Sequence, residues 1–95
     1  MRVITNRRLI EFAARHPLVD TPLQVWRSAM QSQAFANFAQ LKQAFGSADT
    51  VGDLVVFDIG GNKFRLIAFL HYGQQIAYIK HVFTHAEYDQ WNKNR

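Results

Sequence analysis

The stretch Phe83 to Asp89, FTHAEYD, places a hydroxyl, an imidazole, two carboxylates and a phenol within seven residues. Side chains of these types can transfer protons in catalysis. Thr84 and Glu87 also fit a capping box, in which the hydroxyl and the carboxylate each accept a hydrogen bond from the backbone at a helix start. That cap does not need His85 or Tyr88. The pair is therefore either part of a site or two ordinary residues of a first helical turn.

His85 has a physical reason to act as a base. A histidine in the first turn of a helix is held towards its neutral form by the positive helix end, and a neutral imidazole accepts a proton near pH 7.

Arg65 and Lys80 stand among apolar residues in segments that alternate like strands. An arginine in such a strand needs an anionic partner, and the candidates within the chain are Asp58, Glu87 and Asp89. Arg65 is thus expected either to form a structural salt bridge or to bind a phosphate.

Several other kinds of chemistry lack the residues they need. The sequence has no cysteine, which excludes disulfides and thiolate zinc sites. His81 and His85 are four residues apart but straddle the junction between a strand and a helix, so no metal and no other cofactor is expected. The Gly60–Gly61 pair lacks the helix of a phosphate-binding loop, and no Ser nucleophile motif is present.

Helical periodicity predicts four helices around these residues. Thr21 is expected to cap the second with its hydroxyl, ahead of Pro22, and Gly46 to end the third in the left-handed conformation. The predicted helices span Asn6–His16, Thr21–Gln33, Asn37–Phe45 and His85–Asn92, after a short strand Arg2–Thr5.

From Asp53 the apolar period changes to two, which predicts a three-stranded antiparallel meander ending at Phe83. Two-residue turns at Gly60–Gly61 and Gly73–Gln74 would set the register. They place Asp58 opposite Lys63, as a cross-strand ion pair, and Leu66 opposite His81.

One face of this sheet should then be apolar and pack on the helices. The expected apolar face carries Phe57, Phe64, Leu66, Ala68, Leu70, Ile79 and Phe83, with His81 at its margin. The expected polar face carries Lys63, Arg65, His71, Tyr78 and Lys80.

The composition describes one small domain, residues 1–95, of the α+β class. Its net charge of +4 favours a polyanionic partner only weakly, because the charges are scattered and an acidic protein would suit them equally. No signal-peptide pattern or membrane-length apolar run is visible, so a cytoplasmic protein without a membrane partner is expected.

Taken together, the motifs resemble the HigB family of bacterial toxins, relatives of the RelE-type ribosome-dependent mRNA interferases. The string DLVVFDIGGNKFRLIAF, followed by IKHVFTHAEYDQW, carries the resemblance. The earlier pattern of HP, W, F and LKQAFGSAD is similar to the same family, so the likeness covers essentially the whole chain.

The resemblance implies a compact RelE-like fold, with an antiparallel sheet packed on one face by N-terminal helices and a short C-terminal helix. It implies cleavage of ribosome-bound mRNA and neutralisation by a HigA-type helix-turn-helix antitoxin, through which alone the toxin would meet operator DNA. Positions that match the family's catalytic roles by type and place are Arg65, Lys80, His85 and Tyr88, and those that match RNA binding are Lys63, Arg65, His71 and Lys80.

The chemistry implied by this family fits the absence of a nucleophile motif. When the 2′-hydroxyl of the RNA attacks its own phosphodiester, the protein only orients it, stabilises the phosphorane and moves two protons. The alternative is a noncatalytic nucleic-acid-binding or regulatory partner of a helix-turn-helix repressor, using the same basic sheet. No recognition helix with clustered basic or amide side chains is evident, which disfavours direct DNA reading.

Overall fold

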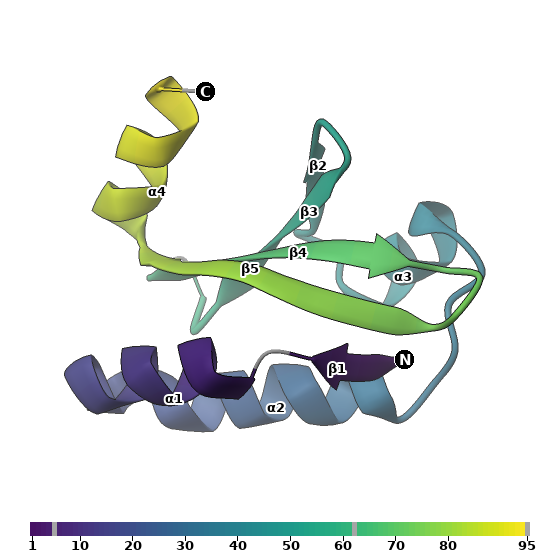
Figure 1. Ribbon diagram of the computed structural model, residues 1–95, viewed down its shortest axis with the longest axis horizontal. Coiled ribbons are helices and arrows are strands. Elements are labelled where there is room, and N and C mark those ends of the chain that lie inside the picture. The colour runs from purple at the N-terminus through teal and green to yellow at the C-terminus, as the bar shows by residue number, and fades with distance from the viewer. Residues whose placement is uncertain (5, 62, 95) are drawn as a thin grey trace.

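The computed structural model describes residues 1–4, 6–61 and 63–94 and shows one five-stranded sheet with helices on both of its faces (Figure 1). The strand order is β1-β5-β4-β3-β2. The strands are β1 (Arg2–Ile4), β2 (Asp49–Val51), β3 (Leu54–Ile59), β4 (Phe64–His71) and β5 (Ile76–Thr84). The helices are α1 (Asn6–Arg15), the 3-10 turn η1 (Pro17–Val19), α2 (Asp20–Gln31), α3 (Phe38–Ala44) and α4 (His85–Lys93).

The α+β class and the expected helices are confirmed, and the sheet is larger than expected. The meander β3-β4-β5 is antiparallel, but β1 joins β5 in parallel and β2 adds a further antiparallel edge. The sheet is therefore mixed. Thr5 and Asn62, expected at the starts or ends of strands, lie outside the described residues.

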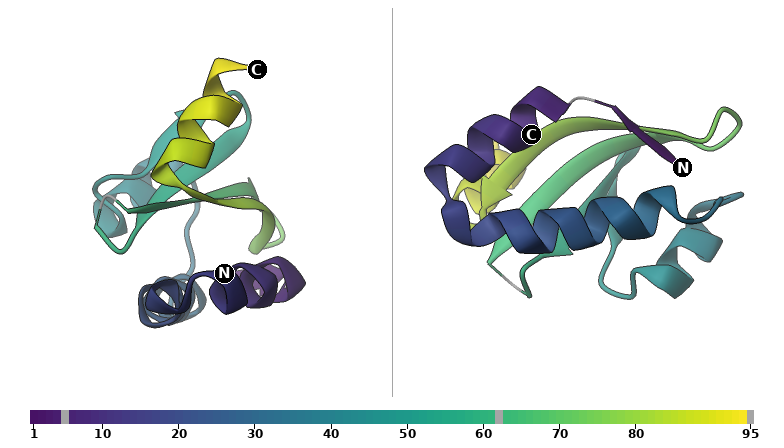
Figure 2. Two further views of the ribbon diagram at one scale, coloured as in Figure 1. Left: turned by 90° about the vertical axis from the view of Figure 1, so that its left-hand side faces the viewer. Right: turned by 90° about the horizontal axis from the view of Figure 1, so that it is seen from below.

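Helices α1 and α2 lie side by side beneath one face of the sheet, as Figure 2 shows from two directions. Their apolar stripes bury Leu9 and Phe12 from α1 and Leu23, Trp26 and Met30 from α2. The predicted apolar face meets them, because Phe57, Phe64, Leu66, Ala68, Leu70 and Ile79 all belong to the core.

Two predicted helix caps are wrong, and the predicted bounds of the helices differ from the observed ones by one or two residues. Helix α2 begins at Asp20 rather than Thr21, and no side chain caps its N-terminus, because η1 runs directly into it. Gly46 does not adopt the left-handed conformation, and Phe45 is the C-cap residue that follows α3. Asn37 does cap α3, accepting a hydrogen bond from the backbone of Gln40.

The first hairpin turn is longer than predicted, and the register differs accordingly. Asp58 pairs with Arg65, not with Lys63, because the loop runs from Gly60 to Lys63 instead of closing on the two glycines. The shift is two residues, so the side chains of β3 and β4 keep their predicted faces. The second turn also has four residues, and Gln75 rather than Gly73 takes the positive φ.

A β-bulge in β5 changes which side chains reach the second face. Ala68 pairs with Ile79 as predicted, but Ile67 pairs with His81, which leaves Lys80 as the extra residue. The residues after the bulge therefore turn over, since one inserted residue reverses the alternation. His81 and Phe83 lie on the face away from α1 and α2, and their predicted place on the apolar face is wrong.

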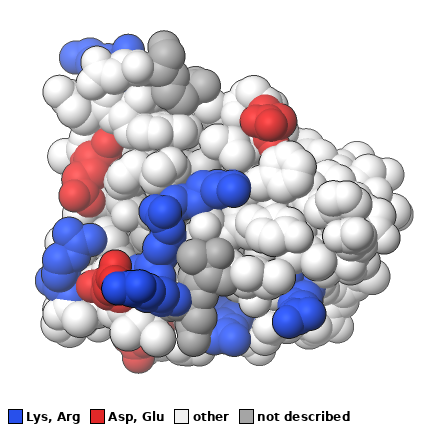
Figure 3. Space-filling view, in the orientation of Figure 1, with Lys and Arg blue, Asp and Glu red and all other residues white. Residues whose placement is uncertain are grey.

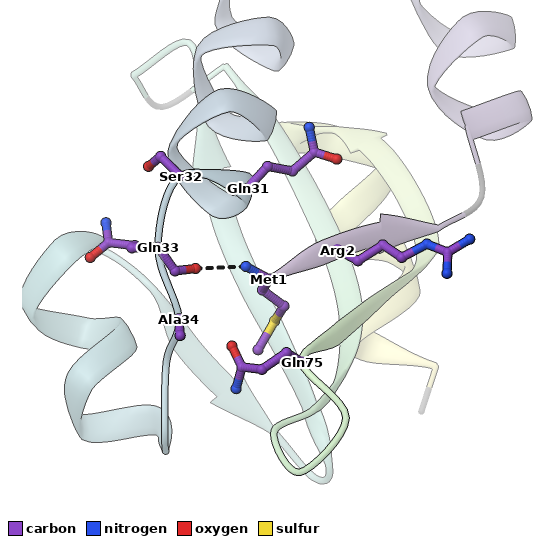
Figure 4. A pocket seen from close by; sticks show the side chains of 7 residues that line it. All are labelled: Met1, Arg2, Gln31, Ser32, Gln33, Ala34 and Gln75. Carbon is purple, nitrogen blue, oxygen red and sulfur yellow. Dashed lines mark hydrogen bonds between the residues drawn. The ribbon is translucent and has the colours of Figure 1, made fainter.

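Strand β1 lies beside the first residues of β5, at the end of that strand far from α4. The amino group of Met1 donates hydrogen bonds of 2.7 Å to the Met30 carbonyl oxygen and 2.6 Å to that of Gln33. A hollow of about 500 Å³ lies here, lined by residues of β1, the end of α2 and the β4–β5 turn (Figure 4). It lies apart from the FTHAEYD stretch, which begins at the other end of β5.

Candidate active site

Helix α4 rises from the end of β5 on the face of the sheet opposite α1 and α2 (Figure 1). Its start is fixed by the predicted capping box, which is confirmed. The Glu87 N–H donates to the Thr84 hydroxyl at 3.2 Å, and the Thr84 N–H donates to the Glu87 carboxylate at 2.8 Å. The cap therefore sets the direction in which His85 and Tyr88 leave the sheet.

Tyr88 of α4 lies over Arg65 of β4 on this face of the sheet. The guanidinium carbon of Arg65 is 5.8 Å from the centroid of the Tyr88 ring, within cation–π range. Beneath it, Arg65 Nε is 3.1 Å from Asp58 Oδ1, so the predicted salt bridge exists, with Asp58 as the partner. Arg65 is 8% exposed, and it is fixed between a carboxylate and a ring.

His85 forms a pair with Asp89 one helical turn later. Its Nδ1 is 3.2 Å from Asp89 Oδ2, and about half of the imidazole is exposed. When Nδ1 carries the proton shared with the carboxylate, Nε2 is left as a hydrogen-bond acceptor. The sequence suggests Asp89 only as a partner of Arg65, although its spacing of four from His85 is a signal for this second role.

Lys80 is exposed, and its ammonium lies 5.9 Å from the Tyr78 ring centroid on the same face as Arg65. The bulge places Lys80 and His81 on this face in succession. Lys63 is exposed in the β3–β4 loop, and its carbonyl accepts the His85 N–H at 3.1 Å. These contacts bring Lys63 to the base of α4.

His71 is not brought together with the other predicted residues. It ends β4 six residues beyond Arg65, which corresponds to about 20 Å along an extended strand. Its Nδ1 accepts the Gln74 N–H at 3.0 Å and so stabilises the β4–β5 turn.

An aromatic cluster extends the site towards the edge of the sheet. Trp91 of α4 contacts Tyr88, Phe83 and His81, with ring centroids 6.0, 5.9 and 5.5 Å away. His81 and Phe83 stack on each other at 5.1 Å. The pKa of His81 is lowered from 6.5 by burial and by the positive charges of Arg8 and Lys80, which keeps its imidazole neutral near pH 7.

Sequence reasoning missed His81 and Asp89 as members of this region.

Within the described ranges, no three His, Asp or Glu side chains gather as metal ligands, and no helix is long and apolar enough to cross a membrane.

Comparison with known proteins places this arrangement in a family. The profile of the HigB toxin family, described as the RelE-like toxic component of a toxin-antitoxin system, matches residues 19–91. The chain belongs to the HigB toxin family. Because this family is the toxic component of a toxin-antitoxin system, membership implies that the partner of this chain is an antitoxin.

The sequences of individual relatives align with nearly the full length of this chain. The mRNA interferase toxin HigB of Escherichia coli K12 is 34% identical over 92 residues, covering 94% of this chain and 88% of the relative. The mRNA interferase HigB of Shigella flexneri shows the same identity and coverage. The mRNA interferase HigB of Escherichia coli O6:H1 is 27% identical over 93 residues, covering 95% of this chain and 90% of the relative.

Proposed function

We propose that this HigB toxin is an mRNA endoribonuclease that cleaves ribosome-bound mRNA in the cytoplasm and thereby inhibits translation. The observation that carries the proposal is the 34% identity to a curated mRNA interferase over nearly the whole of both chains. The face that carries α4 supports it, since it holds the buried Arg65, the exposed Lys80, an imidazole paired with a carboxylate, and a phenol.

In this proposal the substrate supplies the nucleophile. Nε2 of His85, oriented by Asp89, takes the proton of the 2′-hydroxyl, which attacks the adjacent phosphorus and expels the 5′-oxygen. Arg65 and Lys80 stabilise the charge that develops on the phosphorane, and Tyr88 protonates the leaving oxygen. Lys63 contacts a flanking phosphate next to His85. His71 lies at the far end of β4, so it could contact only a part of the RNA that is distant from this site.

This mechanism requires neither a metal nor another cofactor, because both protons and the negative charge are handled by side chains. The partners in the cell would be the ribosome with its mRNA, a HigA-type helix-turn-helix antitoxin and, through that antitoxin alone, operator DNA.

Cleavage of a chemically altered mRNA tests the proposal. Sites are first mapped from RNA ends after brief induced expression, and a ribosome-bound mRNA is then made with a deoxynucleotide before one mapped cut. Cleavage should be abolished at that position and unchanged at a second, unaltered site in the same message, which serves as the control. Continued cutting at the deoxynucleotide would mean that water is the nucleophile. No cutting by the unaltered protein at either site would favour a noncatalytic role.

A further inference from the structure

A cleft opens beside the candidate site, between α1 and the part of β5 that β1 does not cover. Strand β1 pairs only with Ile76 to Tyr78, so the edge of β5 from Ile79 onward has no strand neighbour in the described sheet. The cleft has a volume of about 200 Å³. Its lining comes from Arg8, Glu11, Phe12 and Arg15 of α1 and from His81, Val82 and Phe83 of β5.

The charge of this α1–β5 cleft is positive. Arg8 and Arg15 are both exposed, and within the described part of the chain neither forms a salt bridge. Glu11 is the acidic residue of the lining, and its carboxylate is 3.0 Å from Arg7 Nε. In Figure 3, basic side chains lie over the region of α1, with an acidic side chain among them.

Aromatic rings connect the cleft with the candidate active site. His81 and Phe83, which line the cleft, both contact Trp91, and Trp91 contacts Tyr88 above Arg65. All four rings are partly exposed. Proteins that hold single-stranded nucleic acid combine such rings, on which bases stack, with a cationic groove that follows the phosphates.

We propose that the α1–β5 cleft binds a backbone phosphate of single-stranded RNA, with Arg8 and Arg15 as its cationic partners and the His81–Phe83 stack as a platform for the neighbouring base. The inference rests on the proposed function, since it extends the path of the RNA away from Arg65 and Tyr88. A neutral His81 suits this role, because it offers a flat ring and one N–H donor without drawing a second anion into the cleft.

The test measures RNA binding separately from cleavage. The probe is a short, fluorescein-labelled single-stranded RNA whose 2′-O-methyl groups prevent attack by the 2′-hydroxyl. Arg8→Ala/Arg15→Ala is compared with Arg2→Ala/Lys93→Ala, which removes the same charge from exposed side chains outside the cleft. The cleft variant should bind about tenfold more weakly, and its log–log salt slope should be shallower by about 0.7 for each phosphate that the protein no longer neutralises.

A change of opposite sign gives a second readout. Glu11→Gln removes the negative charge from the cleft lining and should strengthen binding of the same RNA several-fold. Circular dichroism of every variant should show an unchanged helix content, because alanine favours helix.

Sedimentation with ribosomes distinguishes the source of the phosphate. If the cleft variant binds the free RNA normally but ribosomes more weakly, the bound phosphate belongs to ribosomal RNA; weaker binding of the free RNA identifies the message strand. Equal binding of the cleft variant and its charge-matched control in both assays would overturn the proposal. Absence of cleavage by the unaltered protein would contradict the proposed function alone, because binding of the inert RNA is measured without it.

Discussion

Arg65 combines two roles that the sequence left as alternatives. Its salt bridge with Asp58 is structural, and its position under Tyr88 places the same guanidinium within the candidate site. A buried arginine held by a carboxylate can stabilise charge above it without moving, which is the arrangement that favours electrostatic catalysis. Its neighbour Tyr88 is fixed by the same contact.

Arg65→Ala should therefore reduce cleavage of ribosome-bound mRNA by about 10²- to 10³-fold, because a cation facing developing charge contributes ~3 to 4 kcal/mol. Single-turnover cleavage and urea unfolding are measured on the same purified protein, since loss of the buried salt bridge also destabilises the fold. Asp58→Asn is the matched comparison, because it removes the salt bridge and keeps the guanidinium. A wild-type rate for Arg65→Ala would leave Arg65 with a structural role only.

His81 should make the stability of the protein depend on pH. Its pKa is lowered from 6.5 mainly by burial, so between the two pKa values the unfolded chain binds more protons than the folded one. The free energy of unfolding must then rise with pH in this range. The stability due to His81 is present above about pH 6.5 and is lost as the pH falls through the folded pKa.

The His81→Gln variant has no titratable side chain at this position. The free energy of unfolding of the variant should therefore vary less than that of the unaltered protein between about pH 7 and pH 5. Urea unfolding over this pH range measures the difference. Two curves that stay parallel would show that His81 has the same pKa in the folded and unfolded states.

Among the elements, α4 is held against the sheet by partly exposed side chains. None of its described residues is fully buried, and its ring contacts with β5 come from Trp91 against His81 and Phe83. Because His85 and Tyr88 belong to α4, the packing of Trp91 positions both of them.

Trp91→Ala should therefore loosen α4 while leaving the core intact. Amide hydrogen exchange in α4 should become faster by at least about tenfold, since removing a large aromatic side chain costs more than about 1.4 kcal/mol and helix ends open locally. Cleavage should fall with it. Gln90→Ala, an exposed neighbour, is the control. Unchanged exchange in Trp91→Ala would mean that the capping box and the Tyr88–Arg65 contact hold the helix without Trp91.

The sequence predicted these elements better than their pairing. Period and capping residues located the helices and the meander, because both signals are local. The bulge at Lys80 was not predictable from alternation, since Lys80 and His81 read as one inward and one outward residue until the pairing with Ile67 and Ala68 is known. Strand β2 was missed because two of its three residues, Asp49 and Thr50, are polar and exposed, so it shows no apolar pattern.

At the scale of the whole molecule, helices lie on both faces, and the face with α4 carries the candidate site. We expect the HigA-type antitoxin to cover or distort this face. Coexpression with a helix-turn-helix protein encoded next to this toxin should relieve growth arrest. The purified complex of the two proteins should no longer bind inert single-stranded RNA. Growth arrest that continues despite a stable complex would show that binding of this partner does not neutralise the toxin.

The parallel pairing of β1 with β5 has a consequence for folding during synthesis. Arg2 pairs with Ile76, so the edge of the sheet cannot close until most of the chain has been made. Pairings between such distant residues form late, because a long loop must first be closed. Lys80, His85 and Tyr88 come still later in the chain. The ribosome has therefore translated most of this protein before the nascent toxin can assemble the side chains proposed to cleave mRNA.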